Sequence, residues 1–374
     1  MAQIEVRKIQ NKRDLKAFIR LPWAIYNGNP NWVPPLIADV KKILDKSSHP
    51  FYKHSDAEFF IAHQNGKVVG RIAAIENRRH NKFHKENIAF FGFYEAFDDV
   101  EITRALMGKV EEWARERKFT ALRGPMNPST NDSVGMLLKG FDSPPRILMP
   151  YNPSYYNTQM EEAGYRKCED LFAYKMHTYE KLNPAIRSLA ESVRSKPNIC
   201  VRSIDLKNFW QEAEIIKTIY NDAWVSNWGF VPLTDDEFRF IAKELKQIID
   251  PEYALILEVD KVPVAFALSL PDINQALIKI NGRLLPFGLL KLLYHSRNID
   301  ILRIWGLGII KEMQHKRGLA PLLYTETYNR AERNGISFGE FSWILESNIP
   351  MNAAARNMGG KVYKSYRIYE KGLI

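Results

Sequence analysis

The order of apolar and polar residues along the chain predicts strands that alternate with helices. Two runs of β-branched and aromatic residues flank the Asn-Gly pair at 65–66, which is a strong hairpin signal, and a similar pair of runs flanks Asp-Lys at 260–261. Another segment has the apolar spacing of a helix that packs one face on a core, with Ile102, Leu106, Val110 and Trp113 on that face. This alternation favours an α/β fold with a mixed sheet.

The same pattern occurs twice. The two hairpin turns lie 195 residues apart, and two later blocks, Asn152 to Gly164 and Asn348 to Gly360, lie 196 residues apart. Two independent features with nearly the same offset indicate two copies of one fold. We expect the copies and their connection at these positions: residues 1–178 for the first domain, 179–199 for a linker and 200–374 for the second domain.

A basic turn in the second copy is the strongest candidate for chemistry. A strand over 300–309 is followed by His-Lys-Arg-Gly-Leu-Ala at 315–320 and then by a helix over 319–334. Gly318 allows close backbone approach, and N–H groups at a helix N-terminus attract phosphate. The other interpretation is a solvated turn that only begins the helix. The first copy has Asp-Asp at 98–99 and no glycine in this place, so we expect it to lack the phosphate site.

Composition and charge narrow the function classes. The 374 residues carry a formal charge of +10, which favours an anionic partner, but no nucleic-acid-binding motif accompanies it. The two cysteines form no disulfide framework and the histidines have no metal-ligand spacing, so we expect a cytoplasmic protein without a metal. No signal peptide is recognised, and the most apolar stretch, 284–294, is too short to span a bilayer. We interpret that stretch as a buried or interfacial helix, a membrane-touching helix, or the lining of an acyl channel.

Strand, basic turn with Gly318 and Ala320, helix, strand, then Asn348 and Gly360: this succession resembles the GCN5-related N-acetyltransferase (GNAT) superfamily. The segments GPMNPSTND, PYNPSYY and SWILESN are more closely similar to tandem acyltransferase-like proteins of bacteria. The resemblance implies two tandem GNAT-like domains, each with a mixed, mostly antiparallel sheet flanked by helices. It implies acyl-CoA, with an acetyl or a longer acyl chain, as co-substrate, and no metal.

The resemblance also implies roles for individual positions. The backbone of the strand would pair with pantetheine, the turn would hold the pyrophosphate, and the later asparagine would lie near the cofactor: Leu307, Ile309 and Ile310; His315, Lys316, Arg317, Gly318, Leu319 and Ala320; Asn348. The family usually has a tyrosine as general acid where this chain has Ala355, so this proton donor is missing unless Tyr363 or Tyr366 substitutes for it.

The catalytic base and the acceptor site rest on weaker patterns. Glu340 and Glu346 share one face of a strand otherwise typical of a core, so each is a candidate base or the partner of an arginine such as Arg303 or Arg356. Trp224 and Trp228 would form an aromatic wall for the acceptor or pack in the core. The long connection 124–156 would face the cleft of the second domain through polar residues, among them Asn131, Tyr155 and Tyr156.

Together these features predict an acyl-CoA-dependent N-acyltransferase. The acyl group would move to the amine of a small-molecule or lipid-related acceptor, in a cleft formed by the second domain and the loop 124–156. Two other hypotheses stay open at this point. One is an aminoacyl-tRNA-dependent transferase of the peptidoglycan cross-bridge type, and the other is a non-catalytic protein that binds CoA or a lipid.

Overall fold

The computed structural model describes residues 3–373, which form two compact units. The first unit contains the chain up to Leu171, the segment Leu277–Leu292, and the chain from Lys364 onward. The second unit contains Phe172–Ala276 and Leu293–Tyr363. The chain therefore passes between the units four times, and each unit is built from parts of both halves of the sequence.

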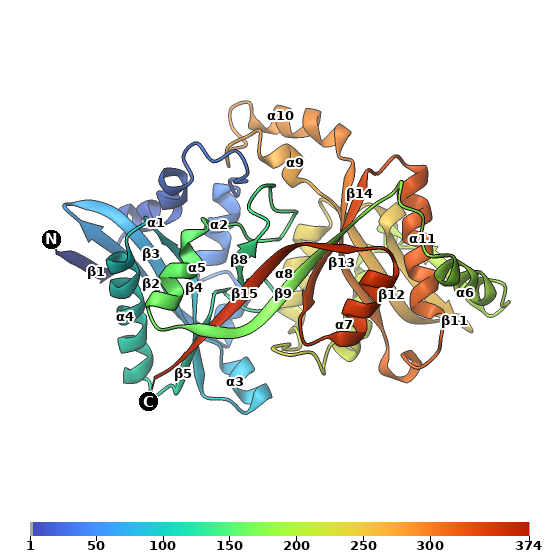
Figure 1. The fold of residues 1–374 in the computed structure, drawn as a ribbon, viewed down its shortest axis with the longest axis horizontal. Helices are drawn as coiled ribbons and strands as arrows, with labels where there is room; N and C mark the ends of the chain where they lie inside the picture. Colours follow the sequence, from blue (N-terminus) through green and yellow to red (C-terminus); the bar gives the residue numbers. More distant parts are fainter. Residues whose placement is uncertain (1–2, 374) are drawn as a thin grey trace. The chain divides into compact units, whose positions relative to one another are not determined.

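The first unit has a mixed sheet with the strand order β1-β2-β3-β4-β5-β15, in which only β4 and β5 are parallel among these neighbours (Figure 1). Its strands are β1 (Ile4–Lys8), β2 (Asp56–Gln64), β3 (Lys67–Glu76), β4 (Ile88–Ala96), β5 (Ala121–Gly124), β6 (Met126–Asn127), β7 (Ser133–Val134) and β8 (Met136–Lys139). Its helices are α1 (Lys12–Ile25), α2 (Ile37–Leu44), α3 (Arg78–His84), α4 (Val100–Glu116) and α5 (Tyr155–Glu162).

The second unit has the strand order β9-β14-β13-β12-β11-β10, with β13 and β14 parallel. Its strands are β10 (Ile199–Ser203), β11 (Ala254–Val259), β12 (Val262–Pro271), β13 (Ile301–Ile309) and β14 (Phe338–Leu345). Its helices are α6 (Pro184–Arg194), α7 (Phe209–Ala223), α8 (Asp235–Leu245), α11 (Leu319–Arg333) and α12 (Ile349–Asn357). The short helices α9 (Asn274–Leu277) and α10 (Gly288–His295) lie between β12 and β13.

The register of the strands repeats between the copies. Ile4 pairs with Gln64 on the neighbouring strand, and Ile199 pairs with Val259, each residue 195 positions further along. The register shift in the first hairpin falls between Ala62 and His63, and that in the second falls between Leu257 and Glu258, again 195 positions further along. The duplication predicted from two turns thus extends to a bulge, which no apolar pattern marks.

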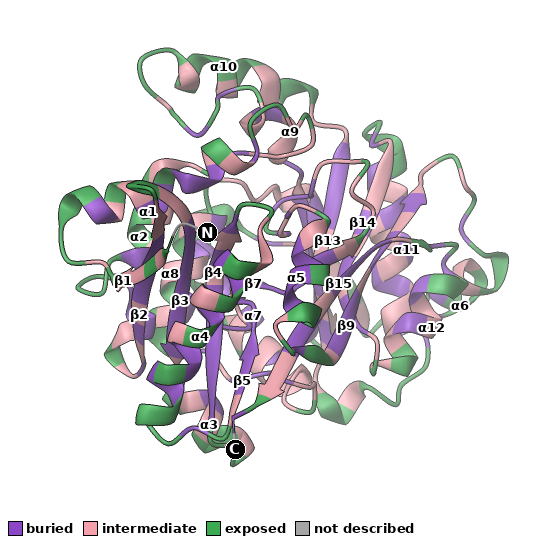
Figure 2. Ribbon diagram, turned by 60° about the vertical axis from the view of Figure 1, so that its left-hand side comes forward, coloured by how far each residue is buried: buried purple, intermediate pink, exposed green. Residues whose placement is uncertain are grey.

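Helices cover both faces of each sheet. In the first unit, α4 shares a core with Phe60 and Ile72, whereas Phe18 of α1 contacts Phe59 on the opposite face of β2. In the second unit, α6 and α11 pack on one face, around Leu257 and Ala265, and Trp224 at the end of α7 stacks on Phe266 from the other. Figure 2 shows the strands mostly buried and the helices exposed along their outer sides. The α/β prediction is confirmed.

The last strand of each copy changes unit. Strand β9 (Arg166–His177) begins in the first unit and, from Phe172 onward, belongs to the second, where its hydrogen-bonded neighbour is β14. Strand β15 (Lys361–Gly372) begins in the second unit and, from Lys364 onward, belongs to the first, where Tyr369 pairs with Gly124 of β5. Each sheet is therefore completed by the final strand of the other copy.

Candidate active site

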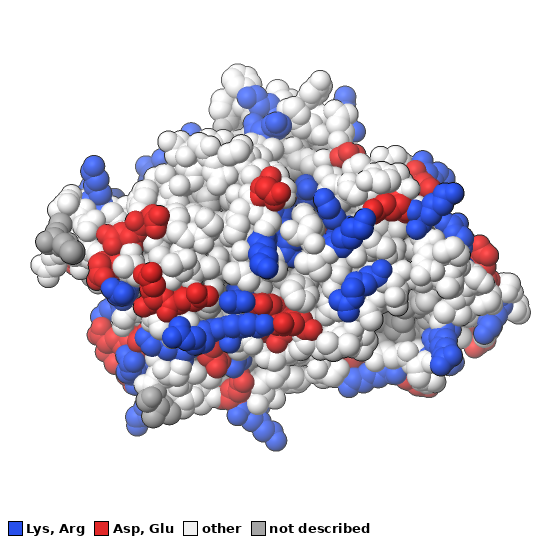
Figure 3. All heavy atoms as spheres, in the orientation of Figure 1, with Lys and Arg blue, Asp and Glu red and all other residues white. Residues whose placement is uncertain are grey.

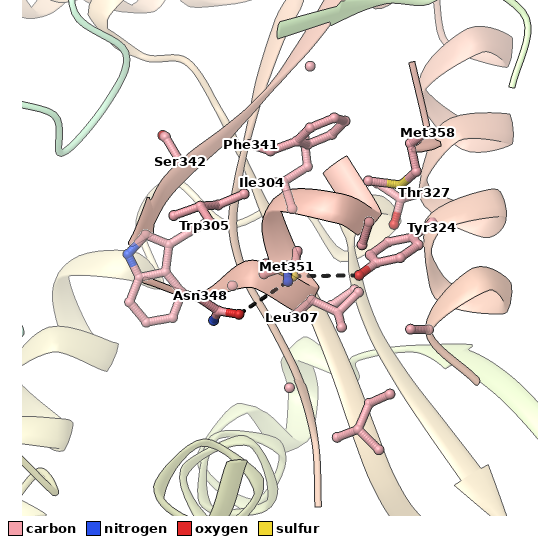
Figure 4. Close-up of a pocket in the computed structure, with 18 of the residues that line it drawn as sticks. Ile304, Trp305, Leu307, Tyr324, Thr327, Phe341, Ser342, Asn348, Met351 and Met358 are labelled. Carbon is pink, nitrogen blue, oxygen red and sulfur yellow. Dashed lines mark hydrogen bonds between the residues drawn. The ribbon is translucent and has the colours of Figure 1, made fainter. Parts of the chain in front are cut away.

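Two diverging strands create the candidate site in the second unit. The register between β13 and β14 runs from Ile301↔Phe338 to Ile304↔Phe341 and stops there, although the strands continue to Ile309 and Leu345. The register of β13 with β12 shifts at the same level, so that Trp305 is an extra residue. A cavity of about 520 Å³ lies beside the diverging strands (Figure 4). This volume is within the ordinary range of small-ligand sites.

The cavity is bordered by β13, β14, α11, α12 and the turn after α7, with contributions from β12, the end of β9 and the residues just after β9. Every lining residue is uncharged, and most are apolar. Ile304, Leu307, Phe341 and Met358 supply aliphatic and aromatic surface, while Tyr324 points its hydroxyl toward the sulfur of Met351 at 3.7 Å (Figure 4). Such a lining suits an uncharged, largely apolar ligand portion.

The basic turn lies at one end of this cavity, since Gln314 and Ala320 are both lining residues. Gly318 is the N-cap of α11 with a φ of 97°, and its carbonyl accepts the N–H of Leu322 at 2.9 Å. A Cβ at this position would lie 2.4 Å from Val193 Cγ2, so only glycine fits without movement. The segment expected to be a linker contributes this neighbour, because α6 packs against α11.

The structure separates the predicted donor residues into two groups. Those that line the cavity are Leu307, Ile309, Ala320 and Asn348. Those outside the lining are Ile310, His315, Lys316, Arg317, Gly318 and Leu319. Within the second group the three basic side chains are exposed, whereas Gly318 and Leu319 are buried. The first helical turn of α11 thus begins between exposed cations and an apolar cavity, the arrangement in which a helix N-terminus attracts an anion.

Trp224 is both a core residue and a cavity residue. Its ring stacks on Tyr220 and Phe266, with centroids at 4.7 and 5.7 Å, and it also lines the cavity. A Cβ on Gly308 would lie 2.4 Å from this ring, so the glycine in β13 allows the tryptophan to cover the strand. Trp228 is outside the lining among the described residues. The two interpretations given for the tryptophans are compatible for Trp224.

A buried polar group lies next to the cavity on β14. Glu340 is completely buried, and its carboxylate accepts hydrogen bonds from the hydroxyls of Ser342, at 2.5 Å, and Tyr363. Arg303 donates its Nε–H to Ser342 Oγ at 2.9 Å. Ser342 lines the cavity whereas Glu340 does not, so the serine connects the carboxylate with the cavity. Glu346 is half-buried and lies just beyond the end of β14.

Sequence reasoning missed Ser342, although a signal was present. It lies two positions after Glu340 and therefore on the same face of the strand. A serine next to a glutamate on a buried face indicates a hydrogen-bonded pair, because a buried carboxylate without partners is costly.

Several tyrosines could supply a proton, and their surroundings differ. Ala355 is buried against Tyr174, and Tyr363 donates to Glu340, while Tyr366 is fully buried in the first unit. Tyr324 lines the cavity from α11, and burial raises its pKa to about 12. It therefore keeps its proton throughout the neutral range. Tyr324 was not among the sequence-based candidates, because its helical spacing reads as core packing.

The predicted acceptor residues of the first copy lie in the first unit. Tyr156 donates to the Glu95 carboxylate at 2.7 Å, and Tyr155 donates to the Ala96 carbonyl at 2.9 Å, so both hydroxyls bond near the end of β4. Asn131 is half-buried, and its backbone N–H donates to Ser129 Oγ at 3.2 Å. Their role in acceptor binding stays a prediction.

The corresponding place in the first unit is filled by the chain itself. The register of β4 with β5 ends at Phe90↔Arg123. The backbone N–H of Phe93 donates to Asn127 Oδ1 at 2.5 Å, and a Cβ on Gly92 would lie 1.8 Å from the Met126 carbonyl oxygen. Asp99 caps α4 by accepting the N–H of Glu101 at 2.9 Å. A ligand that paired with the end of β4 would have to displace both the connection after β5 and the Asp99 carboxylate that caps α4.

Among residues 3–373, no group of three or more His, Cys, Asp or Glu side chains is arranged to hold a metal ion. Over the same described part of the chain, no helix is both long and apolar enough to cross a membrane.

The comparisons with known proteins identify the family. The chain is 36% identical over 379 residues to "Bacterial ceramide synthase" of Caulobacter vibrioides (strain NA1000 / CB15N), covering 100% of this chain and 98% of that protein. It is also 36% identical over 372 residues to "Protein YghO" of Escherichia coli (strain K12), covering 98% and 95%. The chain belongs to the family of these two proteins. No profile of a known protein family matches it.

Solved structures show the fold of this family to be the tandem GNAT fold. A tandem GNAT protein from the clavulanic acid biosynthesis pathway superposes with a TM-score of 0.59 at 12% identity, covering 100% of this chain and 99% of that one. A GCN5-related N-acetyltransferase from Sphaerobacter thermophilus gives a TM-score of 0.53 at 14% identity, with 99% and 96% coverage. The resemblance inferred from the turn and its flanking elements is therefore confirmed. The fold and the curated relative together support acyl transfer as the general activity.

Proposed function

We propose that this tandem GNAT protein is an acyl-CoA-dependent N-acyltransferase that acylates the amine of a long-chain lipid acceptor. The observation that carries the proposal is the uncharged cavity of about 520 Å³, which begins at the basic turn and follows the diverging ends of β13 and β14. The turn supports a polyphosphate donor, and the apolar lining supports aliphatic chains. A ceramide is an N-acylated long-chain amino alcohol, so the name of the Caulobacter relative agrees with this class of acceptor.

The donor would bind with its pyrophosphate at the N-terminus of α11. Backbone N–H groups of the first turn and the exposed Lys316 and Arg317 supply donors and positive charge there. The pantetheine would follow the part of β13 that is not paired with β14, past Ile309 and then Leu307, with Asn348 nearby. The thioester would then lie among the polar groups of β14.

Ser342 and Glu340 are the best-supported proton acceptors for the amine. The nitrogen must lose a proton as it attacks the thioester carbon, because the C–N bond forms while the C–S bond breaks. Ser342 Oγ donates to Glu340 and accepts from Arg303, so its second lone pair is available to a ligand in the cavity. A proton taken by Ser342 would pass to the Glu340 carboxylate. Tyr324 would give its own proton to the leaving thiolate, and it would recover one from solvent as Glu340 releases the proton taken from the amine.

The decisive experiment measures amide formation and thiol release together. Purified protein would be incubated with palmitoyl-CoA and a long-chain 2-amino alcohol, with free CoA followed by a thiol reagent and the amide by mass spectrometry. We expect one amide per CoA released, and little reaction with ethanolamine, which lacks the aliphatic chain. Acetyl-CoA in place of palmitoyl-CoA would show which acyl length the cavity accepts.

Each competing hypothesis gives a different result in this assay. Binding of CoA species without release of thiol would indicate a non-catalytic lipid- or CoA-binding protein. Consumption of aminoacyl-tRNA, with no response to any acyl-CoA, would indicate a transferase of the cross-bridge type. Either result would overturn the proposal.

A further inference from the structure

The segment between β12 and β13 differs from the rest of the molecule in what it exposes. In the second copy this connection contains the short helices α9 and α10, where the first copy has only α3. From Leu285 to Tyr294 it presents large apolar side chains to solvent, with these exposed fractions: Leu285 80%, Phe287 67%, Leu289 47%, Leu290 66%, Leu293 55% and Tyr294 65%. So many adjacent exposed apolar residues are rare on a soluble surface without a partner.

The exposed residues form one face of a helix. Leu289 and Leu293 are four positions apart, as are Leu290 and Tyr294, so the four side chains make one apolar stripe along α10. An amphipathic helix of a globular protein normally packs this stripe on the core. Here Leu292, on the opposite side, is half-buried and the stripe faces outward, as Figure 2 shows by the exposed colouring along α10.

All the charged side chains of the same segment are basic. Between Asp272 and Asp300 there is no acidic residue, whereas Lys279, Arg283, Lys291 and Arg297 are present, and all four are exposed. In Figure 3 the surface at the position of α10 in Figure 1 carries blue and uncoloured atoms. Lys291 lies within α10 and Arg297 just after it, so the cations border the apolar stripe.

The segment is anchored by the residues that come just before its apolar part. Trp23 donates its indole N–H to Asn281 Oδ1 at 2.8 Å, and the N–H of Ile37 donates to the Gly282 carbonyl at 3.1 Å. Gly282 has a φ of 72°, and a Cβ there would lie 2.6 Å from the Pro35 carbonyl oxygen. These contacts, all within the first unit, order the connection just before the apolar residues. The exposed stripe therefore follows an anchored part of the chain.

We propose that α10 and the preceding residues 285–287 dock on the surface of an anionic membrane, with the apolar stripe in the interfacial region and the cations at lipid headgroups. A stripe of leucines bordered by lysine and arginine is the pattern of a helix that lies in the plane of the interface. The absence of acidic residues between Asp272 and Asp300 matches a negative surface. The eight residues of α10 are too few to span, so the contact is interfacial.

Vesicle flotation tests the proposal on the full chain. Wild-type protein would be mixed with vesicles of phosphatidylcholine alone or of phosphatidylcholine with phosphatidylglycerol, whose anionic headgroups attract Lys and Arg side chains. We expect clear flotation only with the anionic vesicles, reduced at high salt because screening weakens the headgroup contacts. A paired Leu290→Asp and Leu293→Asp variant should bind at least about tenfold more weakly, since the two exposed leucines that would enter the interface are replaced by charges.

Matched variants separate the apolar and the electrostatic contributions to vesicle binding. Val262→Asp changes an apolar residue that is 58% exposed at the start of β12, and should leave flotation unchanged. Lys291→Glu with Arg297→Glu should weaken binding to anionic vesicles about fivefold or more per charge. Equal binding of wild type to neutral and anionic vesicles, or wild-type binding by the leucine variant, would falsify the proposal. So would a change from dimer to monomer in the leucine variant together with no vesicle binding, which would assign the stripe to a second copy.

The proposal does not depend on the acyl-transfer chemistry. Thermal unfolding of each variant verifies that the fold is intact, and flotation is measured without substrates. If the protein floats with vesicles but forms no amide, the membrane contact is supported and the proposed function is wrong. If it forms the amide but does not float, the proposed function is supported and the membrane contact is wrong.

Discussion

At the residue scale, the fit of Gly318 against Val193 links the proposed donor site to the stability of the fold. Gly318 and Gly335 flank α11 and both have positive φ, at 97° and 72°, so alanine at either position costs about 1 kcal/mol of backbone strain. Only Gly318 lacks room for a Cβ, because Val193 lies 2.4 Å away, whereas nothing lies within 4 Å at Gly335. We expect Gly318→Ala to lose about 1–3 kcal/mol more than Gly335→Ala.

The effect of the two variants on acyl-CoA binding distinguishes a loss of stability from a loss of donor contacts. Displacement of the first turn of α11 should raise KM for acyl-CoA in Gly318→Ala and leave it unchanged in Gly335→Ala. Thermal unfolding with and without CoA measures both effects. Equal stabilisation of the two variants by CoA would remove the turn from the donor site.

The pair of Ser342 and Glu340 gives a second prediction at this scale. Ser342→Ala removes the connection between the cavity and the buried carboxylate, and Glu340→Gln removes the proton acceptor. We expect each to lower kcat about 100-fold at neutral pH, with KM for acyl-CoA unchanged. The rates of both variants should continue to rise with pH as the acceptor amine loses its own proton. If Glu346→Gln shows this behaviour instead, the base lies at the end of β14.

At the element scale, local patterns anticipated much of the fold. The turns at 65–66 and 260–261 are hairpins whose residues have positive φ, and the strand and the helix on either side of the basic turn begin and end within one residue of their predicted limits. The exchange of β9 and β15 was not predicted. Alternating apolar residues show that a strand has a buried face, but not which sheet it joins, and either sheet satisfies the same pattern.

The candidate site shows the same division between local and distant information. Gly318 and the start of α11 could be predicted from the sequence because a turn and a helix N-terminus are local features. Glu340 was recognised as a buried carboxylate, but Tyr363, its second partner, lies 23 positions away on another strand. The cavity depends on the length over which β13 and β14 stay paired, which no sequence pattern indicates.

The short helix α3 supplies a prediction about pH and stability. Burial lowers the pKa of His80 to about 4, although its hydrogen bond to Glu86 at 2.8 Å acts in the other direction. The unfolded chain binds a proton at His80 below about pH 6.5, which the folded chain does not bind until about pH 4. Stability should therefore be complete above pH 6.5 and fall by up to about 3 kcal/mol as the pH drops to 4. Denaturant unfolding of wild type and His80→Gln measures this, and the variant should lack that part of the pH dependence.

At the scale of the whole molecule, the two copies differ at the place where we propose that the donor binds. Both retain the parallel pair of strands that diverges after a few residues. In the second unit the divergence borders a cavity, and α11 begins at a glycine beside exposed cations. In the first unit Asn127 accepts the N–H that Phe93 would offer a ligand, and Asp99 occupies the N-terminus of α4. In the first copy, groups of the chain itself therefore fill the place that a ligand would take.

This difference predicts one molecule of CoA per chain, although the fold is present twice. Equilibrium dialysis with radiolabelled acyl-CoA should saturate at a ratio of one, and Gly318→Ala should weaken that single site. Asp99→Asn would remove one negative charge from the N-terminus of α4 without removing the cap, and it should still leave the ratio at one, because Asn127 and the Met126 carbonyl continue to fill the diverging strands. A ratio of two in the wild type would contradict the assignment of the donor to the second copy. A ratio of two only in Asp99→Asn would show that charge, rather than the occupying chain, closes the first.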